Sequence, residues 1–166
     1  MPQNGQLIAA SFVDGLVVRI DGRGTLNESV TLRDTVREAL VRDECAIALL
    51  DLNACTYLDS TMLGCLIALH REFSLTADPP RFQIVAGHEA RQRLLAPMRL
   101  DSHLALREDF PPAAGQWMTL KPEQPALAEF GRHVMDCHNR LADAGVPKAD
   151  AFRLVAQQLA SDLAGR

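Results

Sequence analysis

The most constraining feature of this 166-residue sequence is a nearly continuous apolar run from Cys45 to Leu52, CAIALLDL. The run has the length of a single strand, and apolar and polar residues do not alternate along it. Such a run is typical of a strand that is covered on both faces. It therefore predicts a sheet with this segment in its middle.

The segments around this run alternate between strand and helix patterns. Two β-prone runs, Leu7–Phe12 and Leu16–Ile20, flank Asp14-Gly15, a pair typical of a hairpin turn. Apolar spacing predicts helices over 29–42, from 62 until the prolines at 79 and 80, and over 88–98. Strand patterns cover 81–86 and part of 102–109. The order β-β-α-β-α-β-α-β predicts a small α/β sheet domain over residues 1–110.

The remaining residues follow a purely helical pattern after a predicted linker over 111–121, which contains Pro111-Pro112. Residues 122–166 carry two narrow apolar seams with a break at Gly145-Val146-Pro147, which predicts an all-helical hairpin. The seams are Leu127, Phe130, Val134, Cys137 and Leu141, then Phe152, Val155, Leu159 and Leu163. Two interpretations stay open: a hairpin that packs on itself or on the domain, and a docking element or homodimer contact.

Charge and composition exclude several functional classes. The net charge is −4 without a basic cluster, which argues against direct binding of nucleic acid. No stretch approaches the roughly 20 apolar residues that span a bilayer, and residues 1–12 lack the pattern of a signal peptide. The four cysteines show no CxxC spacing. We expect reduced thiols in a cytoplasmic protein that is not inserted in a membrane.

The octet Tyr57–Gly64, YLDSTMLG, places an acid and two hydroxyls where a helical pattern begins. One explanation is helix capping by Asp59 or Ser60, which stabilises a helix by about 0.5–2 kcal/mol. Capping requires one such residue and not three, however. A serine at a strand-to-helix turn also lies at the carboxyl edge of an α/β sheet, where binding sites concentrate. The two roles are compatible.

Catalytic and metal chemistry find little support in the sequence. Ser60 lies outside a GxSxG motif, and no histidine or lysine is its neighbour in sequence; His88 and His103 are bases only by default. His133 and His138 are five residues apart, which places them on different sides of a helix and favours structural roles over metal binding. The glycines at 22 and 24 match no phosphate-binding motif. We expect no enzymatic activity, no metal and no cofactor.

Residues 7–110 resemble the STAS domain of bacterial anti-sigma factor antagonists. The matching elements are Asp51-Leu52, Asp59-Ser60, Leu63-Gly64 and Leu100-Asp101, together with the earlier segment VVRIDGRGTLNE. Thr61 and Met62 depart from the usual family pattern, which has Ser and Gly there. The helices after residue 121 fall outside the resemblance.

The resemblance implies a partner-switching regulator of transcription. In such proteins the serine after the aspartate, here Ser60, is phosphorylated by a serine kinase that is also the anti-sigma factor, and a serine phosphatase reverses this. Partner contacts would lie at Asn27 and in the octet, at Asp59, Thr61, Met62, Leu63 and Gly64. The alternative is a STAS subunit that does not switch, in a transport, lipid-trafficking or sensory assembly.

Overall fold

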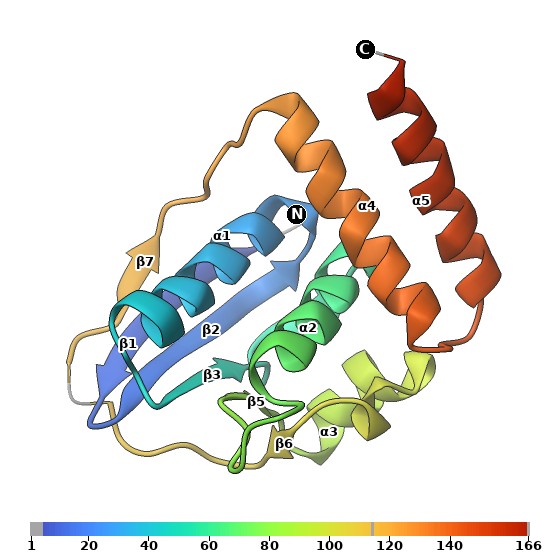
Figure 1. The fold of residues 1–166 in the computed structure, drawn as a ribbon. Coiled ribbons are helices and arrows are strands. Elements are labelled where there is room, and N and C mark those ends of the chain that lie inside the picture. Colours follow the sequence, from blue (N-terminus) through green and yellow to red (C-terminus); the bar gives the residue numbers. More distant parts are fainter. Residues whose placement is uncertain (1–4, 114, 166) are drawn as a thin grey trace.

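The computed structural model describes residues 5–113 and 115–165. Residues 1–4 and 166, at the ends of the two predicted domains, and Ala114 of the predicted linker lie outside the described residues. The chain forms a mixed sheet flanked by helices, with two further helices at its C-terminal end (Figure 1). The predicted α/β class is confirmed.

The sheet is built around the apolar run with which the sequence analysis began. β3 (Ile47–Asp51) lies between β2 (Gly15–Gly24) and β5 (Phe82–Val85), parallel to both. Ala48, Leu49 and Leu50 are fully buried, as expected for a strand covered on both faces. β1 (Gln6–Phe12) pairs antiparallel with β2 across the predicted hairpin, and β6 (Leu106–Arg107) forms one edge beside β5.

Two strands were missing from the sequence-based order. β4 (Cys55–Leu58) pairs with the end of β2, and β7 (Met118–Leu120) pairs antiparallel with β1 at the other edge of the sheet. β7 falls within the predicted linker, and Phe110 and Trp117 of the preceding segment pack against buried residues of the sheet. The described residues of this segment therefore contact the sheet. The domain boundaries remain a prediction.

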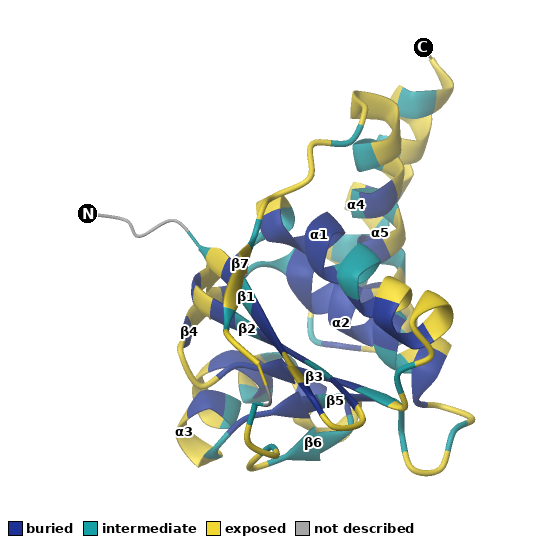
Figure 2. Ribbon diagram, turned by 90° about the vertical axis from the view of Figure 1, so that its left-hand side faces the viewer, coloured by how far each residue is buried: buried dark blue, intermediate teal, exposed yellow. Residues whose placement is uncertain are grey.

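Helices cover one face of this sheet. α1 (Leu26–Arg37) continues as a π-helical turn, Glu38–Arg42, and α2 (Ser60–Phe73) lies beside it (Figures 1 and 2). The predicted helix after Gly87 is broken into α3 (His88–Ala90), a π-helical turn over Arg91–Leu95 and 3₁₀ turns at Ala96–Met98 and Leu100–Ser102. The main core lies between these helices and the sheet.

The predicted hairpin consists of α4 (Leu127–Asp143) and α5 (Ala149–Ala164). α4 packs across α2 and the start of α1, whereas α5 packs mainly on α4 (Figure 1). The buried stripe of α4 differs from the predicted seam: it contains His133, Cys137, His138, Leu141 and Ala142, and Leu127 is exposed. No helix among the described residues is both long and apolar enough to cross a membrane.

Candidate functional site: the Ser60 turn and its cover

The turn from β4 into α2 is held by the carboxylate of Asp59. Asp59 is the N-cap of α2, and its Oδ1 accepts a hydrogen bond from the amide of Met62 at 2.8 Å. Its Oδ2 accepts a second bond from the amide of Leu26 at 2.7 Å, which ties the starts of α1 and α2 together. The predicted capping role is confirmed for Asp59, and the hydroxyl of Ser60 is free for another partner.

That partner comes from α4, 78 residues further along the chain. The Oγ of Ser60 lies 3.1 Å from Nε2 of His138. The other ring nitrogen, Nδ1, lies 2.8 Å from the carbonyl oxygen of Val134 and must donate to it, because a carbonyl only accepts. In the neutral ring Nε2 then carries the lone pair, so the Ser60 hydroxyl donates a hydrogen bond to Nε2 of His138. Ser60 is half-buried beneath this contact.

The sequence offered no signal for this pair. Spacing in the sequence relates His138 only to His133, and no pattern along the chain links His138 to the octet Tyr57–Gly64. The structure places both histidines of α4 in the interface with the domain. His133 contacts α1, and His138 contacts α2. Both side chains are buried in that interface. Within the described residues no cluster of histidines, cysteines and acids could hold a metal ion.

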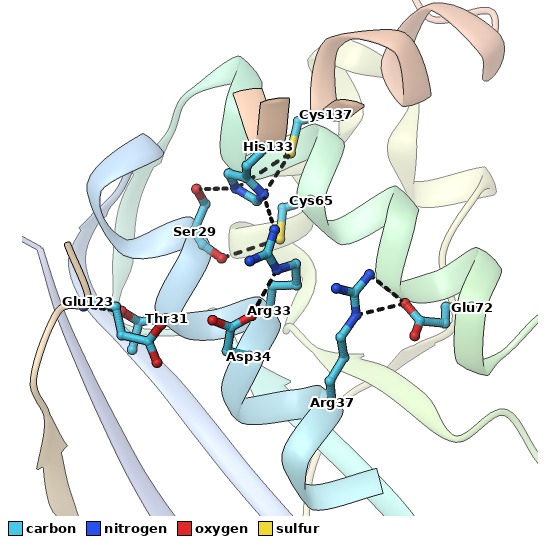
Figure 3. A network of polar contacts seen from close by, with 10 residues as sticks. All are labelled: Ser29, Thr31, Arg33, Asp34, Arg37, Cys65, Glu72, Glu123, His133 and Cys137. Atoms are coloured by element: carbon cyan, nitrogen blue, oxygen red, sulfur yellow. Dashed lines mark hydrogen bonds and ion pairs between the residues drawn. The ribbon is translucent and has the colours of Figure 1, made fainter. Parts of the chain in front are cut away.

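His133 belongs to a buried polar network at the same interface (Figure 3). Arg33 of α1 places Nη1 2.9 Å from Nδ1 of His133, and Nε2 of the same ring lies 2.8 Å from Oγ of Ser29. Arginine only donates, so Nδ1 accepts and Nε2 donates to Ser29, whose own hydroxyl donates to the carbonyl of Leu26 at 2.9 Å. Burial, followed by the charge of Arg33, lowers the pKa of His133 to about 4.

The predicted partner-binding residues separate into two groups. Asn27 is exposed, and together with Asp59 it lines an open cavity of about 570 Å³. Arg23 and Tyr57 line the same cavity, and Cζ of Arg23 lies 4.3 Å from the centre of the Tyr57 ring. The other group comprises Thr61, Met62, Leu63 and Gly64, all of which are buried.

The second group is buried beneath α2 and α4 in this state. Met62 is 0% exposed and Leu63 5%, so these side chains form no accessible apolar patch in this state. Met62 belongs to the main core under the helix, where its apolar side chain is removed from water. Gly64 faces α4 so closely that a Cβ atom there would collide with the main chain of Cys137. Their predicted role in partner contact is not tested by this arrangement.

Comparison with known proteins finds a likeness among solved structures but none among protein families. No protein-family model and no curated protein matches the chain. Among solved structures, the anti-sigma factor antagonist SpoIIAA in its unphosphorylated form is similar, with a TM-score of 0.47 and 15% sequence identity. The match covers 64% of this chain and 90% of that chain.

Proposed function

We propose that this chain is a cytoplasmic partner-switching regulator of the anti-sigma factor antagonist type, controlled by phosphorylation of Ser60. The observation that carries the proposal is that Asp59 caps α2, so the Ser60 hydroxyl at the first position of the helix is not needed for capping and bonds to His138 of α4 instead. The partner of the unmodified protein would be a serine kinase that acts as the anti-sigma factor. A serine phosphatase would restore the unmodified state.

The physical effect of a phosphate supports this role. It adds about −1.5 to −2 charges and three acceptor oxygens at neutral pH. At the N-terminus of α2 the free amides and the helix dipole favour negative charge, so the domain should tolerate the modification. A partner surface pressed against the same turn would have to desolvate that charge, which is costly. Binding would stop while the fold persists.

The test is a phosphorylation assay with the cognate kinase and ATP, in which the modified residue is mapped by mass spectrometry. We expect one phosphate on Ser60 and none on the Ser60→Ala chain. Ser102→Ala is the matched control, because Ser102 is exposed and its hydroxyl bonds only to the carbonyl of Arg99. Normal phosphorylation of the Ser60→Ala chain would refute the assignment.

A pull-down identifies the partner independently. Ser60→Ala and Ser60→Asp chains are immobilised in parallel, and the proteins retained by each are compared. We expect a kinase that binds the Ser60→Ala chain and is released from the Ser60→Asp chain, because the carboxylate mimics part of the phosphate charge. Equal retention by both chains would exclude control at Ser60.

A second candidate is a STAS subunit that docks on its partner without switching. The contact of His138 with Ser60 favours it, since α4 limits access to the hydroxyl in this state. Gene neighbourhood separates the two candidates. An adjacent kinase and phosphatase favour switching, and adjacent subunits of a transport ATPase favour constitutive docking.

The contact between Ser60 and His138 also has the form of a serine nucleophile with its base. Here, however, the base is oriented by the main-chain carbonyl of Val134 and not by a carboxylate, and the cavity of about 570 Å³ is not lined by Ser60. We assign no catalytic role to the pair. Hydrolysis of p-nitrophenyl acetate that is lost in both the Ser60→Ala and the His138→Ala chain would overturn this.

A further inference from the structure

The surface formed by α1 and α2 receives a helix in this structure. α4 crosses it and makes its closest approach at Gly64, where the absence of a side chain lets the main chain of Cys137 come into contact. Cys137 and Leu141 are almost completely buried in the core shared with α2. The surface is therefore shaped for a helix that crosses closely at Gly64.

The same surface also binds polar side chains of α4 through hydrogen bonds. Ser60 donates to the imidazole of His138, while Ser29 and Arg33 satisfy both ring nitrogens of His133 (Figure 3). Each hydrogen bond of this kind contributes little net free energy, because water offers the separated groups comparable partners. An interface that combines apolar contacts with such bonds can open without exposing a purely apolar surface.

The connections of α4 to the rest of the chain suit movement. β7 fixes the preceding segment on the sheet, and the amide of Glu123 donates to Oγ1 of Thr31 at 2.7 Å. Residues 121–126 have neither helix nor strand structure, and Ala126 supplies no side-chain cap for α4. On α5, Ala156 is buried, while Leu154 and Val155 are exposed. α4 and α5 can thus leave together about a pivot at 124–126, which follows the bond of Glu123 to α1.

We propose that the α1–α2 surface is a helix-binding site, which α4 occupies in this state and which an amphipathic helix of the partner protein occupies after displacing α4. The proposal rests on the proposed function only in naming the partner of the Ser60 turn as the ligand. The incoming helix would copy α4: a close main-chain approach at Gly64, an apolar side chain in place of Leu141, and an acceptor for the Ser60 hydroxyl. Recognition of an amphipathic helix in a groove is a recurrent binding mode.

The test uses a fluorescent synthetic peptide of residues 124–145 and the full-length chain. In the wild-type chain the site is filled, so the apparent affinity for the peptide is reduced by the fraction of chains with α4 undocked. Leu141→Asp disables the chain's own α4 without changing α1 or α2, since Leu141 lies on α4 and is fully buried. We expect this chain to bind the peptide at least about tenfold more tightly than the wild type does.

Controls make both outcomes decisive. Leu154→Asp places the same charge on α5 at a side chain that is 65% exposed, and it should bind the peptide as weakly as the wild type. A peptide of scrambled sequence should not bind at all. If Leu141→Asp prevents folding, the double substitution His133→Ala and His138→Ala serves in its place, because it removes the hydrogen bonds of α4 to α1 and α2.

The proposal is overturned if the folded variants bind the peptide no better than the wild type. In that case the amides of α4 would exchange with deuterium only as slowly as those of the sheet, as expected for a permanent core helix. A full-length dimer that the peptide dissociates, seen by light scattering, would also overturn it, because a second copy would then be the occupant. The peptide-binding assay contains neither kinase nor nucleotide. Its result therefore does not depend on whether Ser60 can be phosphorylated.

Discussion

The sheet domain and the C-terminal hairpin are stabilised in different ways. In the domain, β3 and α2 bury long runs of apolar side chains, whereas in the hairpin α4 buries a narrow stripe that contains two histidines (Figure 2). Apolar burial contributes about 0.8 kcal/mol for each buried CH₂ group, so the stability of the domain is spread over many residues. The docking of α4 depends on few residues. This difference indicates that α4 can detach from the domain while the sheet stays folded.

The largest test of this difference compares two buried leucines. Leu66→Ala in α2 and Leu141→Ala in α4 each remove a fully buried side chain, with an expected loss of about 2–5 kcal/mol. For Leu66 we expect a lower free energy of global unfolding in urea. For Leu141 we expect faster hydrogen exchange confined to α4 and α5. Equal acceleration in the strands of both variants would show that the hairpin and the sheet unfold as one unit.

Acid should release the hairpin before it unfolds the sheet. His133 has a pKa of about 4 when docked and 6.5 when free, so below pH 6.5 only the released imidazole takes up a proton. The free energy of docking should fall by up to about 3 kcal/mol between pH 6.5 and 4, and His133 contributes no pH dependence above 6.5. The charged groups around the ring belong to α1: Arg33, Asp34 and Arg37.

Hydrogen exchange of α4 amides across this range is the measurement. His133→Gln should flatten the pH dependence, whereas His103→Gln, at an exposed position away from α4, should preserve it. An unchanged slope in the His133→Gln chain would assign the acid sensitivity to groups other than His133.

A matched pair of glycines tests the closest contact between the two regions. Gly64→Ala introduces a Cβ that collides with the main chain of Cys137, so α4 must shift, at an expected cost of about 1–3 kcal/mol. Gly131→Ala lies within α4 but faces the flexible side chain of Leu163, and the higher helix propensity of alanine should offset the contact. Proteolysis within 121–126 should accelerate only for Gly64→Ala. Equal cleavage of both variants would contradict the close approach at Gly64.

The smallest expected effect belongs to the Ser60 hydroxyl. Ser60→Ala removes its bond to His138 and should weaken the docking of α4 by about 0.5–1.5 kcal/mol, while Asp59 continues to cap α2. The measurement is hydrogen exchange at the end of α4 near His138, with Ser102→Ala as the control. No change in exchange would show that the contact contributes nothing to docking.

The sequence by itself determined the local elements of this protein. The apolar run at 45–52 and the start of a helix at Asp59-Ser60 are short-range patterns, and the structure contains both. The predicted hairpin is also present, with its turn at Val13-Asp14, one residue before the predicted pair. β4 and β7 escaped prediction because such short strands exist only through pairing with β2 and β1, which are remote in sequence. A pattern along the chain carries no signal of such pairing.

The tertiary structure alone decided what surrounds Ser60. His138 reaches Ser60 only because α4 crosses α2 at Gly64, and Met62 is buried because the turn directs it beneath the helix and not toward solvent. Periodicity fixes which residues share a face of an element, since that depends on local geometry. Which face meets which depends on the packing of the whole chain, and at this site that packing placed an imidazole beside the hydroxyl.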